Sequence, residues 1–339
     1  MNKFVRLLIY KVQNMEKQYV IGVDMGGTNT AIGVVDARGN ILCDTVISSE
    51  GDTTGNEYAK RLGKAINELI EKNDLKGKIK GIGMGAPDAN MKKGTIEHAA
   101  NIPWAKTVVV PMADLLTAET GLPCVLPNDA NAAAVGEMYY GAAKGMKDFI
   151  MITLGTGLGS GIVIGGKLVL GAGEEGLAGE LGHVRVVRHN GRTCGCGRTG
   201  CLEAYCSATG VARTAREYLE LFPEKKTLLR DIVDRPITAK DVFKAAEKGD
   251  EMALEIFDFT GKVLGDAFCD FITFSTPEAI VLFGGLAHAG EYLLKPIREQ
   301  MEKEILTMYK GKTKVIISNL NDSAEAAILG NSAIAWEYT

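Results

Sequence analysis

A strand that runs into a glycine-rich turn and then a hairpin occurs twice in this chain, and this repetition limits the folds that it can adopt. The turns are Gly26-Gly27-Thr28 and Gly155-Thr156-Gly157, and at one constant offset Gly27 falls on Gly155, Thr28 on Thr156 and Gly33 on Gly161. Because each copy is one supersecondary unit, the repetition predicts two similar domains that face each other. Coincidence is the alternative, since glycine turns are common and the chain has 41 glycines.

Strands alternate with helices through much of the chain. Apolar, β-branched runs at residues 19–24 and 279–283 predict buried strands, and apolar side chains at helical spacing predict helices over 54–72 and 252–274. This alternation favours an α/β fold class. We divide the chain into an N-terminal extension at residues 1–16, a first α/β domain at 17–130 and a second at 131–323, with the helix at 324–339 packed back on the first domain.

Composition excludes several classes of protein. The 339 residues are 46% hydrophobic and 24% charged, which is the balance of a soluble globular protein, and the net charge of −4 gives no broad basic surface for nucleic acid. The apolar stretch at residues 4–10 is too short to span a membrane, and we expect no membrane partner. Seven cysteines without a sign of secretion indicate reduced thiols, so we expect a cytoplasmic protein.

The first glycine turn, Asp24-Met25-Gly26-Gly27-Thr28-Asn29-Thr30, follows a predicted buried strand. Glycines allow backbone amides to face phosphate oxygens, the threonines add hydroxyl donors, and Asp24 can orient a hydrated Mg²⁺ on a nucleotide. A plain hairpin turn is the alternative. The residues that we assign to the nucleotide site here are Asp24, Gly26, Gly27, Thr28, Asn29 and Thr30.

Two further glycine pairs complete the predicted nucleotide site. Gly155-Thr156-Gly157 has the same chemistry as the first turn, and two copies on opposite domains can clamp a nucleoside triphosphate between them. Gly284-Gly285 follows a strand, and a base or ribose can press against a backbone that has no side chains. A tight turn between a strand and a helix is the simpler interpretation of this second pair.

A histidine and three cysteines lie close together at His183, Cys194, Cys196 and Cys201. Three thiolates and one imidazole suit tetrahedral Zn²⁺, and four protein ligands leave no open position, so the sequence predicts a structural zinc loop at residues 179–203. Free thiols are the alternative, and His189 and Cys206 are rival ligands.

Several polar residues can serve a sugar-like alcohol. Asp129 follows an apolar run, so we interpret it as a general base at the end of a strand, with Asn128 as a hydrogen-bonding neighbour. Asp129 can instead cap the helix that follows. Glu180 and Glu203 flank the predicted zinc loop, which can hold both carboxylates toward hydroxyl groups; each alone could be a solvated surface charge.

At this point the motifs resemble the ROK family (repressors, open reading frames, kinases), and its glucokinase-like sugar kinases in particular. The resemblance covers nearly the whole chain, from about residue 19 to the C-terminus. It rests on Asp24-x-Gly-Gly-Thr-Asn, Asn128-Asp129-Ala130-Asn131-Ala132, Gly155-Thr156-Gly157-Leu158-Gly159-Ser160-Gly161, Glu180-x-Gly-His183 and Cys194-Gly-Cys-Gly-Arg-Thr-Gly-Cys-Leu-Glu203.

The resemblance implies an actin-like ATPase fold (hexokinase/ribonuclease H-like), with two similar domains around a cleft, and ATP-dependent phosphorylation of a hexose, usually at its 6-hydroxyl. Asp129 would be the catalytic base. The residues that would contact the sugar are Asn128, Asp129, Glu180, His183, Glu203 and, from a looser match, Asn101. The chain departs from the family pattern at Asp88, where the family more often has glycine after proline.

We therefore expect a kinase that uses ATP with Mg²⁺, carries a structural Zn²⁺ and forms a homodimer or homotetramer. Glucose is the expected substrate; fructose, mannose, N-acetylglucosamine and N-acetylmannosamine are alternatives, as is a sugar-sensing regulator without catalytic activity. Family repressors carry a DNA-reading domain ahead of the kinase-like core, and fewer than about twenty residues precede the first predicted strand here.

Overall fold

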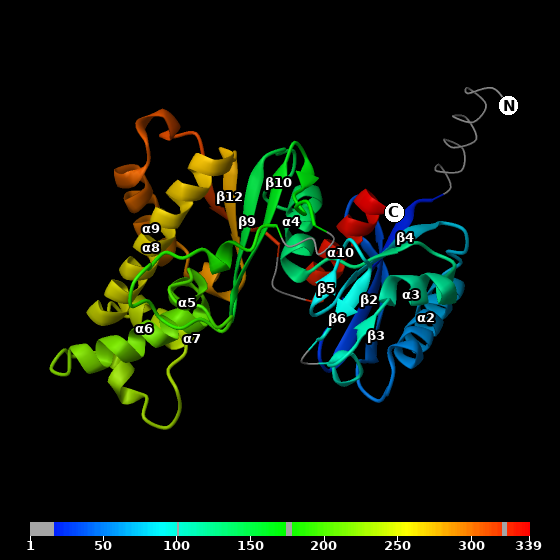
Figure 1. The fold of residues 1–339 in the computed structure, drawn as a ribbon, viewed down its shortest axis with the longest axis horizontal. Helices are drawn as coiled ribbons and strands as arrows, with labels where there is room; N and C mark the ends of the chain where they lie inside the picture. The colour runs from blue at the N-terminus through cyan, green and yellow to red at the C-terminus, as the bar shows by residue number, and fades with distance from the viewer. Residues whose placement is uncertain (1–16, 100–101, 174–177, 321–323) are drawn as a thin grey trace. The chain divides into compact units, whose positions relative to one another are not determined.

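The computed structural model of the protein describes residues 17–99, 102–173, 178–320 and 324–339 (Figure 1). The predicted extension at 1–16 and the predicted sugar contact Asn101 lie outside these residues. The chain divides into two compact units. The first comprises Met1–Lys144, Leu170–Leu177 and Leu320–Thr339, and the second comprises Gly145–Val169 and Ala178–Asn319.

The boundary that we predicted after residue 130 is wrong by one helix. Helix α4 (Asp129–Tyr140) belongs to the first unit, because it packs against the C-terminal helix α10 (Ala324–Tyr338) of that unit. A Cβ atom added to Gly136 of α4 would lie 3.0 Å from the Cα atom of Gly330 in α10. The two helices therefore approach closely through glycine, a contact that no local sequence pattern reveals.

A five-stranded sheet forms the centre of the first unit, in the order β3-β2-β1-β4-β8. β1, β2 and β3 are antiparallel neighbours, whereas β4 and β8 run parallel to β1. The strands are β1 (Tyr19–Met25), β2 (Asn29–Asp36), β3 (Ile41–Ser48), β4 (Ile79–Gly85) and β8 (Cys124–Val125). A small second sheet contains β5 (Ala89–Asn90), β6 (Thr95–Glu97) and β7 (Val109–Val110).

Alternate residues of β1 face different helices. Ile21 and Val23 pack with α2 (Gly55–Lys72) and α3 (Met112–Thr120), whereas Val20 packs with α10 on the opposite face. α10 lies directly on the sheet, because Gly22 and Gly83, which pair across β1 and β4, have no side chain to hold it away. A Cβ atom on Gly83 would lie 1.9 Å from the carbonyl oxygen of Asn331.

Gly83→Ala is therefore expected to lower the free energy of unfolding by about 3 kcal/mol, because overpacking forces α10 away from the sheet. Urea denaturation measures this change. Gly27→Ala is the matched control, since a Cβ atom there meets nothing within 4 Å. Equal stability of the two variants would show that α10 can shift at little cost.

The sheet of the second unit repeats the first, in the order β11-β10-β9-β12-β13. β9, β10 and β11 are antiparallel neighbours, and β12 and β13 run parallel to β9, so strand order and direction match those of the first unit. The strands are β9 (Phe149–Leu154), β10 (Leu158–Ile164), β11 (Lys167–Leu168), β12 (Ala279–Phe283) and β13 (Lys314–Ile317). This equivalence confirms the prediction of two similar α/β domains.

Helices cover the second sheet, and two of them, α8 and α9, pack closely against each other (Figure 1). The helices are α5 (Glu203–Cys206), α6 (Ala208–Leu221), α7 (Ala239–Glu247), α8 (Glu251–Ser275) and α9 (Glu291–Glu304). Short 3-10 turns are η1 (Pro103–Ala105), η2 (Leu181–His183), η3 (Leu228–Asp231), η4 (Gly285–Ala289) and η5 (Thr307–Tyr309).

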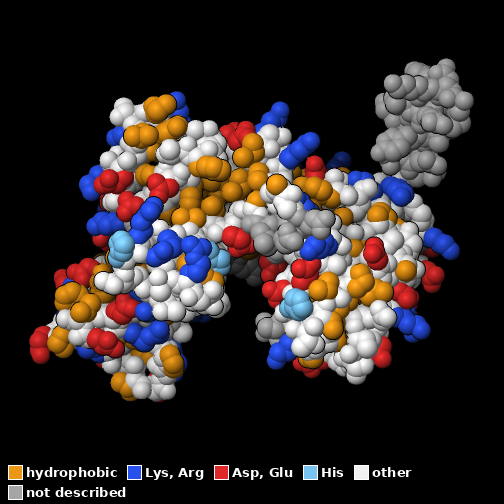
Figure 2. Space-filling model, in the orientation of Figure 1, with side chains coloured by type: hydrophobic (Ala, Val, Ile, Leu, Met, Phe, Trp, Pro, Cys, Tyr) orange, Lys and Arg blue, Asp and Glu red, His pale blue; other side chains and the backbone are white. Residues whose placement is uncertain are grey.

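The surface carries mixed charge. Figure 2 shows Lys and Arg side chains interspersed with Asp and Glu on the visible face of each unit, without one broad basic field. In the described part of the chain, no helix combines the length and apolarity needed to cross a bilayer.

Candidate active site

Three carboxylates lie at or just beyond the ends of three neighbouring strands of the first unit. Asp24 lies near the end of β1 and pairs in register with Gly85, the last residue of β4. Asp88 comes shortly after Gly85, and Asp129 comes shortly after β8, which runs parallel to β4. Because parallel strands end at the same edge of a sheet, these acids are brought together there, which is where α/β sheets commonly bind ligands.

Asp129 has an exposed side chain at the start of α4. The N-cap of α4 is Asn128, whose Oδ1 accepts a hydrogen bond of 2.8 Å from the backbone nitrogen of Asn131. The alternative in which Asp129 caps the helix is therefore wrong, and its carboxylate is left for another partner. Asn128 uses its oxygen as the cap, which leaves its amide N–H groups as donors.

Like charges and partial burial change the proton affinity of these acids. Although part of the Asp129 side chain is exposed, the surrounding protein atoms keep water from much of its carboxyl group, and this burial, together with the charge of Asp88, raises the pKa of Asp129. Burial and the charge of Asp129 raise the pKa of Asp24 to about 6. A carboxylate with a raised pKa is a stronger base, and a pair of repelling carboxylates also favours a cation beside it.

The first glycine turn is only partly available to a phosphate. The backbone nitrogen of Gly26 donates to the carbonyl of Asn29 at 3.0 Å, whereas Gly27, Thr28 and Asn29 are exposed. Thr30 is fully buried, and its hydroxyl bonds to Ser49 Oγ at 2.8 Å and to Tyr58 Oη at 2.7 Å.

The assignment of Thr30 to the nucleotide site is therefore wrong. Thr30 begins the inward-facing part of β2, so its hydroxyl closes a network in the core rather than facing a ligand. Thr28, two residues earlier and exposed, is the threonine of this turn that can reach a phosphate.

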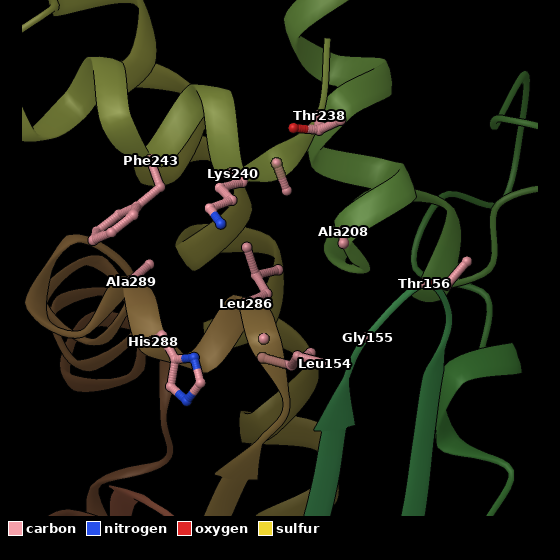
Figure 3. Close-up of a pocket in the computed structure, with 12 residues that line it drawn as sticks. Leu154, Gly155, Thr156, Ala208, Thr238, Lys240, Phe243, Leu286, His288 and Ala289 are labelled. Atoms are coloured by element: carbon pink, nitrogen blue, oxygen red, sulfur yellow. The ribbon is translucent and has the colours of Figure 1, made fainter. Parts of the chain in front are cut away.

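A pocket of about 560 Å³ lies within the second unit, beside the second glycine turn (Figure 3). Gly155 and Thr156 lie at one side of it, and Gly285 and Leu286 are also among the lining residues. Three of the predicted nucleotide residues therefore meet at one cavity. Gly284 is not in the lining: a Cβ atom there would lie 2.8 Å from the carbonyl oxygen of Leu154, so this glycine allows β12 to turn close to β9.

Sequence reasoning missed the far wall of this pocket. It is formed by the start of α7, from which Lys240 and Phe243 project toward the cavity, and by His288 of η4 (Figure 3). Thr238 and Asp241 form a capping box that starts α7, and that local signal explains the helix without indicating a ligand. Only the fold brings this helix beside the glycine turn.

The four predicted zinc ligands come together in the second unit. The ligand atoms of His183, Cys194, Cys196 and Cys201 all lie within 4.8 Å of one another. Sγ of Cys196 is 3.7 Å from Sγ of Cys201, and Sγ of Cys194 is 3.8 Å from Nδ1 of His183. A zinc tetrahedron with Zn–S bonds of about 2.3 Å has S···S edges of roughly 3.8 Å, so this donor set fits Zn²⁺.

The two rival ligands lie elsewhere. Cys206 is buried and its thiol donates to the carbonyl of Thr260 at 3.7 Å, and His189 is not part of the group of four. The isolated pairings of Arg185 with Cys201 and Thr193 with Thr199 bring the two halves of the loop together.

The cysteine-histidine loop is hydrogen-bonded to the second glycine turn. Glu203 accepts a hydrogen bond of 2.9 Å from the backbone nitrogen of Leu158, and its other oxygen accepts one of 3.3 Å from Sγ of Cys194. Ser160 bonds to the carbonyl of Gly179 and accepts from the backbone nitrogen of Leu181. The segment that carries Glu180 and His183 is thereby fixed on β10, and Glu180 keeps an exposed side chain.

Two α/β units with the same strand order, each with a glycine turn after its first strand, define an actin-like ATPase fold. The model of the ROK family matches residues 20–337, and the chain belongs to the ROK family. It is 38% identical to a glucokinase of Halalkalibacterium halodurans over 91% of this chain and 93% of that protein. It is 35% identical to a glucokinase of Thermotoga maritima over 95% of this chain and 99% of that protein.

A similar solved structure is also that of a glucokinase. The structure of a ROK family glucokinase from Streptomyces griseus in complex with glucose and AMPPNP is 35% identical, covers 94% of this chain and 99% of that one, and superimposes with a TM-score of 0.69. The predicted family and fold class are confirmed.

Proposed function

We propose that this chain is an ATP-dependent hexose kinase that transfers the terminal phosphoryl group of ATP to the 6-hydroxyl of glucose. The observation that carries the proposal is the exposed carboxylate of Asp129 at the edge of the first sheet. This carboxylate is free for a substrate because Asn128, and not Asp129, caps α4. The similarity to glucokinases over almost the whole chain supports glucose as the hexose.

In the proposed phosphoryl transfer, Asp129 is the general base, and its raised pKa increases its affinity for the proton. As the sugar oxygen forms its bond to the γ-phosphorus, the bond from that phosphorus to the bridging oxygen of ADP breaks, and Asp129 receives the hydroxyl proton. Asn128 can donate a hydrogen bond to the same sugar. Mg²⁺, which Asp24 would help to hold through water, neutralises phosphate charge when it is bound.

The second unit would hold the nucleotide. The apolar walls of its pocket suit a flat base. In the exposed turn, the backbone nitrogen of Gly155 donates to the carbonyl of Gly157 at 3.0 Å, so Thr156 would supply the donors to phosphate. The first turn, through Gly27, Thr28 and Asn29, would supply further phosphate donors. Zn²⁺ at the four ligands would stabilise the loop that positions Glu180, His183 and Glu203 for the sugar.

Release of ADP across a panel of hexoses and amino sugars tests this proposal. We expect kcat/KM to be highest with glucose, and ATP hydrolysis without sugar to be slow. If activity is highest with N-acetylmannosamine or another member of the panel, that sugar and not glucose is the substrate. Sugar binding without ADP release from any of them would instead support a regulator without catalytic activity.

Lys240→Ala is expected to raise KM for ATP about tenfold and to leave KM for glucose unchanged. The reason is that the ammonium group faces the nucleotide pocket, where a charge-assisted hydrogen bond to a phosphate contributes roughly 1.5 kcal/mol or more. Lys244→Ala is the control, since Lys244 is an exposed lysine one turn along the same helix and outside the lining. Steady-state kinetics at varied ATP measures the difference; equal KM values for both variants would remove Lys240 from the site.

A further inference from the structure

We infer that Glu217 is a positioning residue for sugar binding: it orients Arg192 and Arg213, and these two arginines clamp the cysteine-histidine loop (residues 179–203) to α6. The inference rests on the proposed role of that loop in holding the sugar. It concerns a network of ion pairs in the second unit that includes no metal ligand and lies outside the nucleotide pocket.

One carboxylate holds both arginines. Oε2 of Glu217 accepts hydrogen bonds from Nε and Nη2 of Arg192, at 3.1 and 2.5 Å. Its other oxygen, Oε1, accepts from Nε of Arg213 at 2.9 Å. Charge-assisted bonds to a planar guanidinium fix its orientation as well as its position. The placement of both guanidinium groups therefore depends on Glu217.

Arg192 joins separate parts of the cysteine-histidine loop. Its backbone carbonyl accepts a hydrogen bond of 2.8 Å from the nitrogen of Gly200, and its backbone nitrogen donates to Oη of Tyr205 at 2.8 Å. Its Nη1 donates to the carbonyl of Ala204 at 3.2 Å. Gly200 directly precedes a predicted metal ligand, and Ala204 directly follows the predicted sugar contact Glu203. Arg192 thus holds the loop beside both groups of functional residues.

The guanidinium of Arg192 is buried and depends on its partner for charge compensation. The side chain is 8% exposed, and its Cζ lies 4.6 Å from the ring centroid of Tyr205 and 5.9 Å from that of Phe259. A cation packed against two aromatic rings has little water around it, so removal of its carboxylate partner leaves a buried charge uncompensated. A neutral side chain at residue 217 should therefore draw the guanidinium toward solvent and break its bonds to the loop.

Arg213 forms the second arm of the clamp. Its Nη1 donates to the carbonyl of Thr193 at 3.2 Å, and Thr193 directly precedes the predicted metal ligand Cys194. Arg213 and Thr193 also line a cavity of about 290 Å³, together with Glu203 and with Gly157 of the second glycine turn. The clamp therefore borders the cavity that a predicted sugar contact shares with a predicted phosphate turn.

α6 is a fixed platform for this clamp. Its N-cap, Ser207, accepts a hydrogen bond of 3.0 Å from the nitrogen of Gly210, and Val211 is fully buried in the core of the second unit. The nitrogen of Ala208 donates to the carbonyl of Gly155 at 2.8 Å, so the start of α6 is bonded to the second glycine turn. A loop that is held on α6 is thereby held in place relative to the nucleotide pocket.

The test compares Glu217→Gln with wild type and with Glu220→Gln, a matched change at an exposed glutamate of the same helix. We expect Glu217→Gln to raise Kd for glucose about fivefold or more in calorimetric titration, because the loop loses bonds to charged groups. KM for ATP should stay within about twofold, since the start of α6 holds the glycine turn without the clamp. Glu220→Gln should match wild type in both.

Hydrogen exchange of the protein as purified shows where the structure loosens. In Glu217→Gln, the amides of residues 192–200 should exchange about tenfold faster or more, whereas those of α8 should keep the wild-type rates. Faster exchange spread equally over the loop and α8 would assign the network to global stability and overturn the inference. Unchanged exchange in the loop, or an unchanged Kd for glucose, would also overturn it.

Arg213→Met supplies a second variant that leaves the buried pair of Arg192 and Glu217 intact. It should weaken glucose binding less than Glu217→Gln does, and the double variant should bind glucose as Glu217→Gln alone does, because Glu217 acts through Arg213. Losses that add up in the double variant would contradict this. The exchange readout needs no turnover: a loop that loosens selectively supports the clamp even if no sugar is phosphorylated, a result that would overturn only the proposed function.

Discussion

Asp129→Asn should lower kcat for glucose phosphorylation by about three orders of magnitude or more, while KM for ATP and the affinity for glucose stay within about twofold. The amide cannot accept the hydroxyl proton, and general-base catalysis contributes typically 10²–10⁴-fold. The substitution keeps the shape of the side chain, and the cap of α4 is unaffected because Asn128 provides it. Steady-state release of ADP measures the loss, and calorimetric titration with glucose measures the affinity.

Asp114→Asn is the matched control for this variant. Asp114 is an exposed acid in the first turn of α3, as Asp129 is in the first turn of α4, and it lies in the same unit. Any change in helix electrostatics should therefore appear in both variants, whereas the loss of turnover should appear only in Asp129→Asn. Turnover of Asp129→Asn near the wild-type value would refute the role of Asp129 as the base.

Removal of metal should produce the second large effect. We expect a chelator, or the substitution Cys201→Ser, to weaken glucose binding at least about tenfold, because the loop at residues 179–203 loses the ion that fixes it. Limited proteolysis should then cut this loop first. Glucose affinity should return when Zn²⁺ is added back to the chelated protein, and this recovery separates metal loss from irreversible unfolding.

Cys269→Ser provides the control for the cysteine substitution. Cys269 is a half-buried thiol in the same unit, outside the group of four ligands, and its contact with the carbonyl of Met301 is long, at 3.9 Å. Its glucose affinity should equal that of wild type. A metal-free sample that binds glucose with unchanged affinity would contradict the link between the metal and the sugar-binding residues.

The features that the sequence predicts well are those encoded by spacing along the chain. The repeated glycine turn indicates two equivalent units, and the two sheets have the same strand order. The ligands His183 to Cys201 lie within one loop, so their meeting needs no long-range packing. Asp129 is recognisable as a candidate base because it lies between the end of a predicted strand and the start of a predicted helix.

The features that the sequence does not predict depend on contacts between distant segments. Helix α4 lies in the first unit because Gly136 meets Gly330, nearly two hundred residues away. Thr30 looks like a phosphate ligand until the fold places Tyr58 beside its hydroxyl. In the sequence, Lys240 is only a residue near the start of a predicted helix. It lines the pocket because α7 packs beside η4 in the fold.

The most direct test of the central claim is to follow ATP and glucose by phosphorus NMR in the presence of the wild-type protein. The account predicts a sugar phosphate monoester that appears in step with ADP, with carbon spectra placing the phosphate on the 6-hydroxyl, and little free phosphate. ATP that stays intact, or that is converted only to ADP and free phosphate, would contradict it.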